Sequence, residues 1–324
     1  MAVDFERAAR EVMRGIRGQR SQVAFSRRLG FRSNVAAKWE SGQRLPTACE
    51  ALAYSQRMGF DVSARLATFH AATAPCLAKV DAARVATWLE ALRGTQTLSA
   101  LSQRSGLSRF SVSRFLSARS QPRLSQFLQL VDALTDRLPD FAHAWVGIEH
   151  VPSLAVRYQR AQAAREAMFE QPLCLAVMCL LDTQAFDVPA RAQLERLART
   201  LGRSPRAIRA CIETLLRGQV LGKVRDRYRL TGSLSIDTNA DAARERAARA
   251  YWTKLAHERV KAPSARDLCS YNVFSVTRAD YEKLKQLQRE FFRGARALIA
   301  ASEPTEMAGL LLVNLVGWEA EPTK

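Results

Sequence analysis

The sequence lacks the long apolar runs that membrane proteins carry. No stretch of 18 consecutive apolar side chains occurs among its 324 residues, and a helix needs about that many to cross a bilayer. The first fifteen residues also lack the apolar segment of a secretory signal peptide. These absences predict a soluble, cytoplasmic protein without a membrane partner.

Metal-binding and redox motifs are missing as well. The six cysteines form no Cys-x-x-Cys pair, and several fall at apolar positions of helical patterns. This predicts buried reduced thiols rather than disulfides or a zinc site. The four histidines are scattered without a ligand cluster. We therefore expect no metal and no other cofactor.

The sequence also has none of the common catalytic motifs. It contains no glycine-rich phosphate loop, no Gly-x-Ser-x-Gly and no His-Glu-x-x-His. Its acidic residues do not pair in the manner of a two-metal nuclease. We therefore expect a binding protein rather than an enzyme.

Basic residues are in clear excess, with a formal net charge of +18 at pH 7. Residues 1–79 and 151–236 each carry seven more basic than acidic side chains, whereas 80–150 and 237–324 each carry two more. This distribution is typical of nucleic-acid-binding modules joined to a region with another task. The alternative is a basic surface that only keeps the protein soluble.

Residues 21–46 predict two short helices joined by a tight turn. Ser21 can cap a first helix in which Phe25 and Leu29 lie four residues apart on one face, and Gly30 permits the sharp turn. A second helix is expected to start near Ser33. Its inward side chains are Val35, Ala36 and Trp39, and its outward ones are Asn34, Ala37 and Lys38.

This layout resembles the lambda-repressor/Cro-like helix-turn-helix family, often called XRE. The residues that match the family pattern are Gln22, Gly30, Trp39, Glu40, Gly42 and Pro46. The resemblance implies binding to double-stranded DNA. The residues implied to contact DNA are Gln22, Ser33, Asn34, Ala37, Lys38 and Arg44. An ordinary helical hairpin is the alternative.

The pattern recurs 76 residues later, in residues 97–122. The shift places Gly30 on Gly106 and Pro46 on Pro122. After the expected cap Ser108, the residues predicted to contact DNA are Arg109, Phe110, Ser111 and Arg114. The second copy departs from the family pattern at Phe115, Leu116 and Ala118. A copy that serves only packing or dimerisation is therefore the alternative.

Helices are predicted around each copy from the spacing of apolar residues. For the first copy they span residues 3–18, 48–58 and 62–72, and for the second they contain Val85 to Leu92 and Phe127 to Leu134. The boundary between the copies is expected at 71–80. Pro139 is expected to break the chain, with Phe141, Trp145 and Val146 covering the bottom of the second bundle.

A connecting helix at 153–170 is expected to lead into a third module. Helices at 172–183 and 190–201 and one opening at Ser204-Pro205 precede two short alternating segments, which predict a β-hairpin. This order is similar to winged-helix repressors of the MarR and ArsR kind. The resemblance implies DNA contact through Ser204, Arg206, Arg209, Arg225 and Arg227. A winged helix that contacts only protein is the alternative.

The tail is predicted to alternate strand, helix and strand. A helix opened by Thr238 and Asp241 runs to about residue 260, strands are expected at 269–277 and 309–318, and a helix capped by Thr277 lies between them. With the winged helix, this tail resembles a bacterial regulator family of poorly defined role, first noted as paralogues in Fibrobacter. That resemblance implies no particular functional residues.

The tail is also expected to make the protein a homodimer. One long helix cannot cover two strands that are apolar on both faces, so pairing with a second copy is favoured. A tail that packs on its own winged helix, or one that holds a ligand pocket, is the alternative.

The sequence thus predicts a mainly α-helical protein with tandem helix-turn-helix bundles, a winged helix and a small C-terminal α/β domain. The expected domains span residues 1–75, 80–150, 153–236 and 238–324. The expected function is a sequence-specific DNA-binding transcriptional regulator. The alternatives are a plasmid or phage replication or partition protein, and a protein-interaction scaffold that does not bind DNA.

Overall fold

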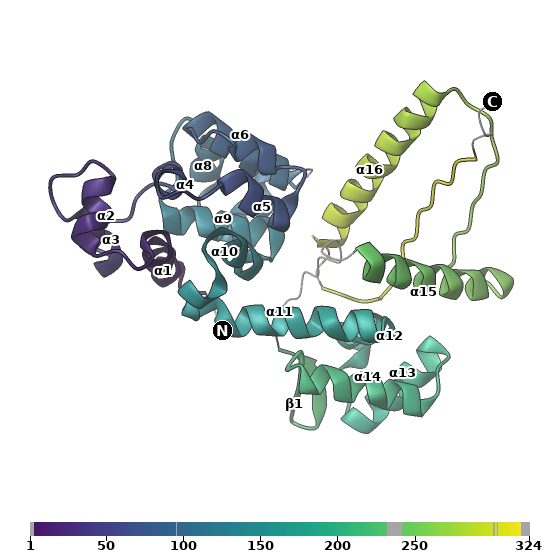
Figure 1. The fold of residues 1–324 in the computed structure, drawn as a ribbon. Coiled ribbons are helices and arrows are strands. Elements are labelled where there is room, and N and C mark those ends of the chain that lie inside the picture. The colour runs from purple at the N-terminus through teal and green to yellow at the C-terminus, as the bar shows by residue number, and fades with distance from the viewer. Residues whose placement is uncertain (1–2, 95, 232–241, 301, 303, 319–324) are drawn as a thin grey trace. The chain divides into compact units, whose positions relative to one another are not determined.

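The structure, a computed structural model, describes residues 3–94, 96–231, 242–300, 302 and 304–318. These residues divide into two compact units, the first reaching residue 164 and the second beginning at 165. Most of the described chain is helical (Figure 1). The predicted fold class, mainly α with a small β part, is confirmed.

The first unit contains two runs of five α-helices. The first run is α1 (Phe5–Arg17), α2 (Gln22–Arg28), α3 (Val35–Ser41), α4 (Ala48–Arg57) and α5 (Val62–His70). After a 3-10 turn, η1 (Ala74–Leu77), the second run is α6 (Ala82–Arg93), α7 (Leu98–Ser105), α8 (Arg109–Leu116), α9 (Leu124–Thr135) and α10 (Leu138–Val146).

Side-chain caps fix where the helices of both helix-turn-helix pairs begin. The Ser21 hydroxyl accepts the amide of Ala24 at 3.2 Å, and the Ser108 hydroxyl accepts that of Ser111 at 3.1 Å. The cap of α3 is Asn34, one residue after the predicted start. An N-cap satisfies an amide that the helix leaves without a partner. The predicted first helix and turn are confirmed, with Gly30 at a φ of 88°.

The helical run breaks next to Pro139, as expected, because α9 ends at Thr135 and α10 begins at Leu138. Pro139 lies in the first turn of α10. The first amides of a helix have no partner within it, so the missing N–H of proline removes no bond there. The helix that follows buries Phe141, Trp145 and Val146, as expected.

One aromatic core joins the two runs of helices. The Phe141 ring contacts Trp88, Phe127 and Trp145 from the second run, with ring centres 5.5 to 5.7 Å apart. It also contacts Phe69 of α5 at 5.4 Å. Because Phe141 packs against both runs, the two bundles predicted as separate domains share a single hydrophobic core.

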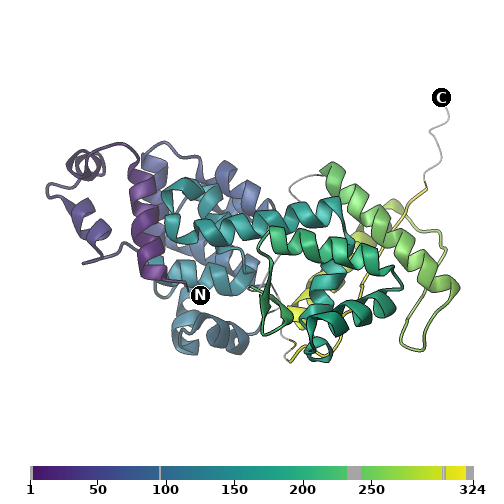
Figure 2. The same cartoon turned by 90° about the horizontal axis from the view of Figure 1, so that it is seen from below.

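The second unit begins within α11 (Pro152–Glu170), the long teal helix visible in Figures 1 and 2. Its compact part contains α12 (Leu173–Leu181), the 3-10 turn η3 (Gln184–Phe186), α13 (Ala190–Leu201), α14 (Pro205–Arg217), β1 (Leu221–Val224) and β2 (Arg227–Leu230). The two strands are antiparallel, with Val224 opposite Arg227. The structure has the predicted order of three helices and a hairpin.

The tail contains α15 (Ala242–Lys261) and α16 (Arg278–Ala300). Thr277 caps α16 as expected, since its hydroxyl accepts the amide of Asp280 at 3.1 Å. The proposed start at Thr238 and Asp241 lies outside the described residues.

The predicted strands at 269–277 and 309–318 are wrong, because neither segment is a strand in the structure. A strand needs a neighbour for its backbone groups, and no ladder joins these segments to each other or to another described strand. The Val313 carbonyl instead accepts the side-chain amide of Gln288 on α16, at 3.1 Å.

Candidate nucleic-acid interface

Most of the polar residues predicted from the first copy lie on α3 or in the loops that flank it. Ser33, Asn34, Lys38 and Arg44 are exposed, whereas Ala37 is half-buried. The side-chain oxygen of Asn34 accepts the amide of Ala37 at 3.3 Å as the cap of α3. Its amide nitrogen, the Lys38 ammonium and the Arg44 guanidinium are exposed groups that can donate hydrogen bonds.

Gln22, also predicted to contact DNA, takes part in an internal cluster instead. Its side-chain nitrogen donates to Glu40, which is 7% exposed, at 3.0 Å. The same carboxylate accepts from Arg17 Nε at 2.6 Å and lies 3.7 Å from Arg14 Nε. This cluster ties α1 and α2 to α3 and sets the orientation of α3.

Sequence reasoning recorded Glu40 only as part of a family pattern and missed its structural role. The usable signal was an acidic residue next to inward-facing Trp39, preceded by two arginines three residues apart in α1. A carboxylate at a buried position needs such partners.

The second copy replaces this cluster by apolar contacts. The residues 76 positions after Gln22 and Glu40 are Leu98 and Leu116, and Leu116 is buried. The position equivalent to Arg14 is Glu90, which pairs within α6 with Arg93 at 2.6 Å. The departure from the family pattern therefore exchanges an ionic link for packing and keeps the helix pair.

The turn after the second helix is also kept despite its substitution. Gly42 has a φ of 84° and its equivalent Ala118 a φ of 57°. Both amides donate to the carbonyl three residues earlier, at 3.3 Å. Alanine in this left-handed region is strained by about 1 kcal/mol, so the surrounding contacts hold the turn.

The outer face of α8 is more basic and more aromatic than that of α3. Arg109 and Arg114 are exposed, and Phe110 is 71% exposed. The Arg114 guanidinium lies 5.4 Å from the centre of the Phe110 ring. The Ser111 hydroxyl accepts a hydrogen bond from Ser108 at 2.9 Å.

The helix α14 presents arginines in the second unit. Ser204 caps it by accepting the amide of Ala207 at 3.3 Å, and Pro205 occupies its first position. Arg206 and Arg209 are exposed on its surface.

The hairpin after α14 holds its arginines in two ways. Arg225 at the tip is exposed and, like Asp226, has a positive φ, as a tight two-residue hairpin requires. Arg227 and Arg229 instead both donate to the carboxylate of Asp187. The hydrogen bond from Arg229, followed by the charges of both arginines, lowers the pKa of Asp187, so this carboxylate is ionised at neutral pH.

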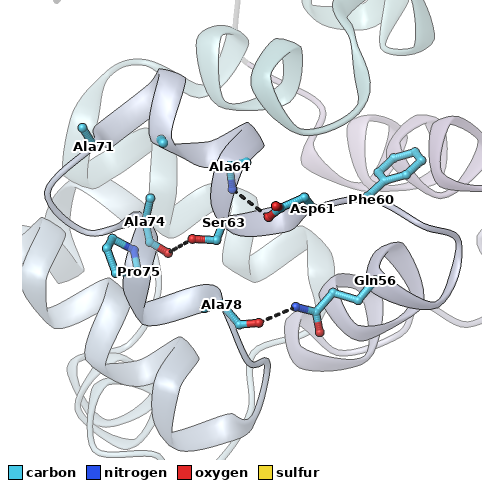
Figure 3. A pocket seen from close by; sticks show the side chains of 10 residues that line it. Gln56, Phe60, Asp61, Ser63, Ala64, Ala71, Ala74, Pro75 and Ala78 are labelled. Carbon is cyan, nitrogen blue, oxygen red and sulfur yellow. Dashed lines mark hydrogen bonds between the residues drawn. The ribbon is translucent and has the colours of Figure 1, made fainter.

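A pocket of about 630 Å³ lies between α4, α5 and η1 (Figure 3). Its polar groups are already bonded within the protein. The Gln56 side chain donates to the Ala78 carbonyl at 3.1 Å, and the Ser63 hydroxyl to the Ala74 carbonyl at 3.0 Å. Asp61 accepts the amide of Ala64 as the cap of α5. The pocket therefore offers a ligand few unsatisfied polar groups.

The described residues hold neither a metal-binding cluster nor a membrane-spanning helix. They contain no group of three His, Cys, Asp or Glu side chains that could hold a metal ion. None of their helices is both long and apolar enough to cross a membrane. All six cysteines are free thiols, of which Cys174 and Cys211 are buried.

Residues 158–310 match a protein-family model. The model is described as a domain of unknown function, DUF4423. The match covers most of α11, the three helices with their hairpin and most of the tail. It leaves the two N-terminal helix runs outside, and no helix-turn-helix family model matches them. No curated protein and no solved structure matches the chain.

Proposed function

We propose that the protein is a sequence-specific DNA-binding transcriptional regulator that acts in the cytoplasm as a homodimer. The observation that carries this proposal is the repeated geometry of the first unit. Two capped helices, α3 and α8, each follow a short helix and a tight glycine turn. Each buries its apolar side and leaves basic and polar side chains outside. This is the arrangement by which helix-turn-helix proteins read a major groove.

The exposed side chains suit both parts of DNA recognition. Arginine and lysine donate to the O6 and N7 atoms of guanine, and apolar groups contact the thymine methyl. On α8 these chemistries are combined in Arg109, Phe110 and Arg114. The net charge of +18 supplies the attraction to phosphates that any site requires.

The second unit adds a reading helix and a backbone contact to this proposal. Arg206 and Arg209 of α14 would contact bases, and Arg225 at the hairpin tip would contact phosphate. Arg227 is less suited to contact DNA than Arg225, because it already donates a hydrogen bond to Asp187.

The homodimer is supported by the surface of the tail. Twenty large hydrophobic side chains are exposed in the described residues, and fifteen of them lie between 268 and 318. The segments 268–277 and 307–318 contain no charged residue, so phosphate is an unsuitable partner. A second copy offers a matching apolar, uncharged surface.

The proposal is tested by selecting binding sites from a random DNA library with the full-length protein. We expect one sequence pattern to be enriched. A plot of the logarithm of the binding constant for that site against the logarithm of the salt concentration should have a slope on the order of −6 or steeper. The reason is that several modules neutralise phosphates. A slope near −2 with no enriched sequence would favour the scaffold, and iterated sites at one origin would favour a replication protein.

Substitutions in the second unit separate base reading from backbone contact. Arg209→Ala should relax the preference at one base pair by about 1 to 3 kcal/mol. Arg225→Ala should instead weaken all sequences alike. Arg84→Ala on α6 is the control for loss of one charge, since Arg84 already pairs with Asp81 at 3.3 Å and is not among the residues predicted to contact DNA. Equal losses on specific and random DNA for Arg209→Ala would contradict its reading role.

A further inference from the structure

The two runs of helices in the first unit correspond helix by helix. Adding 76 to the first residues of α2, α4 and α5 gives those of α7, α9 and α10. The correspondence extends to the loops after the reading helices. The Arg44 amide donates to the Lys38 carbonyl at 3.2 Å, and 76 residues later the Ser120 amide donates to the Arg114 carbonyl at 3.2 Å.

The two runs also meet through equivalent residues. The Ala48 amide donates to the Pro122 carbonyl at 2.9 Å, and the Leu124 amide donates to the Pro46 carbonyl at 2.9 Å. Ala48 and Leu124 are 76 residues apart, as are the two prolines. An isolated antiparallel β-bridge between the two runs pairs Thr47 with Arg123, and these residues are also 76 positions apart.

A reciprocal contact of this kind identifies the symmetry that relates the runs. Exchanging them turns each hydrogen bond into the other, as in the isologous interface of a two-fold dimer. Runs related by translation would instead meet through different surfaces. Helix packing agrees, because α4 contacts its equivalent α9 and α5 contacts its equivalent α10. The first unit is therefore built as a dimer within one chain.

We propose that this internal pseudo-dimer, residues 1–164, reads two half-sites on one DNA duplex, with α3 on one half-site and α8 on the other. The inference rests on the proposed function and adds its geometry. Dimeric helix-turn-helix proteins place two-fold-related helices in major grooves about one helical turn apart. Here one chain supplies both helices in a fixed relation, so one chain covers both half-sites.

The two half-sites should differ in sequence because the two helices do. Lys38 of α3 and Arg114 of α8 occupy equivalent exposed positions, which makes them a matched pair of probes. Around Lys38 the exposed face carries Asn34, whereas around Arg114 it carries Arg109 and Phe110. The binding site is thus a bipartite sequence without a palindrome inside each chain's footprint.

The test uses the full-length protein, library selection and anisotropy titration with labelled duplexes. Lys38→Ala should change base preference in one half-site only, and Arg114→Ala in the other, each by about tenfold in affinity for the preferred base. Arg209→Ala identifies the bases read by α14, so that they are not assigned to the pseudo-dimer.

Spacing between the half-sites tests whether the two helices are held rigidly. Inserting five base pairs between them turns one half-site to the opposite face of the duplex. We expect the affinity to fall to that of DNA in which one half-site is scrambled. Undiminished binding to the expanded site would overturn the pseudo-dimer, and so would Lys38→Ala and Arg114→Ala acting on the same bases.

Failure of the inference can be told apart from failure of the function. An enriched sequence that depends on Lys38 but not on Arg114 keeps the DNA-binding function and removes the pseudo-dimer. No enriched sequence with any variant removes the DNA-binding function itself.

Discussion

The first unit and the tail differ in the burial of their large apolar side chains. In the first unit, the large aromatic residues Trp88, Phe127, Phe141 and Trp145 are fully buried. In the tail, Tyr271 is 94% exposed and Trp318 is 81% exposed. The two regions differ in whether the described chain supplies a partner surface for these side chains.

Duplication explains why the first unit can bury its apolar surfaces within one chain. Each run of helices leaves a surface that the other covers, through the reciprocal bonds at Ala48 and Leu124 and the packing of Phe69 on Phe141. The tail occurs once, so an equivalent surface would have to come from a second molecule. One region thus completes its interface within the chain, and we expect the other to complete it between chains.

The largest expected effect comes from placing a charge on the tail. Leu311→Lys or Val273→Lys would bury a lysine in the proposed dimer interface. We expect the mass from light scattering to halve. Affinity for a DNA with two binding sites should fall about 100-fold, because linked sites lose their high effective concentration. Gln286→Lys on the polar side of α16 is the matched control, and a dimer that persists in both tail variants would remove this interface.

The next largest effect should come from replacing the ionic cluster around Glu40 in the first run by the apolar arrangement of the second run. Glu40→Leu copies Leu116 of the second run but leaves Arg17 and Gln22 without their acceptor. We expect the free energy of unfolding in urea to fall by about 2 kcal/mol. Adding Arg14→Glu and Gln22→Leu installs the whole second-run arrangement and should recover most of the loss. A triple variant no more stable than Glu40→Leu would show that the two solutions are not interchangeable.

A smaller effect should come from the hydrogen bond that crosses between the runs. The Trp145 indole donates to the Ser55 hydroxyl at 2.9 Å. Trp88 is equally buried, but its indole nitrogen has no hydrogen-bond partner among the described residues. Trp145→Phe and Trp88→Phe remove similar volumes, so the first should cost about 1 kcal/mol more in urea unfolding. Equal costs would mean that this bond contributes nothing to joining the runs.

The smallest effect concerns the hairpin, where an exposed carboxylate holds two arginines. Asp187→Asn removes a negative charge and loosens Arg227 and Arg229, so affinity for all DNA sequences should rise about two- to threefold. The lowered pKa of Asp187 means that its ion pairs stabilise the hairpin fully above the usual aspartate pKa of about 3.9 and are lost as pH falls through the lowered pKa. Protection factors of the β1 and β2 amides at pH 7 and pH 2, each corrected for the intrinsic exchange rate at that pH, measure this. Unchanged protection factors, or weaker DNA binding by Asp187→Asn, would contradict the role given to this clamp.

Local features of the structure followed closely from the sequence. The helix predicted at 190–201 has those bounds, and Ser21, Ser108 and Thr277 cap helices as expected. Such features depend on residues within about four positions of each other, where helix periodicity and capping act. The binding roles assigned to the exposed arginines stay predictions, because exposure allows contact with DNA without requiring it.

Features that depend on distant residues were predicted less well. The segments 269–277 and 309–318 have the composition of strands, yet a strand exists only beside a second one, and the structure gives them none. The place of Gln22 in the motif predicted contact with DNA, but its side-chain amide donates a hydrogen bond to Glu40, eighteen residues away. The spacing of residues close together in the sequence predicts neither the absence of these strands nor the hydrogen bond between Gln22 and Glu40.

The sequence by itself determined that the first unit contains two equivalent runs of helices, because a 76-residue repeat requires similar local structures. It did not determine how the runs meet, since equal modules can be related by translation or by rotation. The tertiary structure decided for a two-fold relation through the reciprocal bonds of Ala48 and Leu124. Those bonds and the shared aromatic core join residues more than 70 positions apart, and only the folded chain brings them within reach.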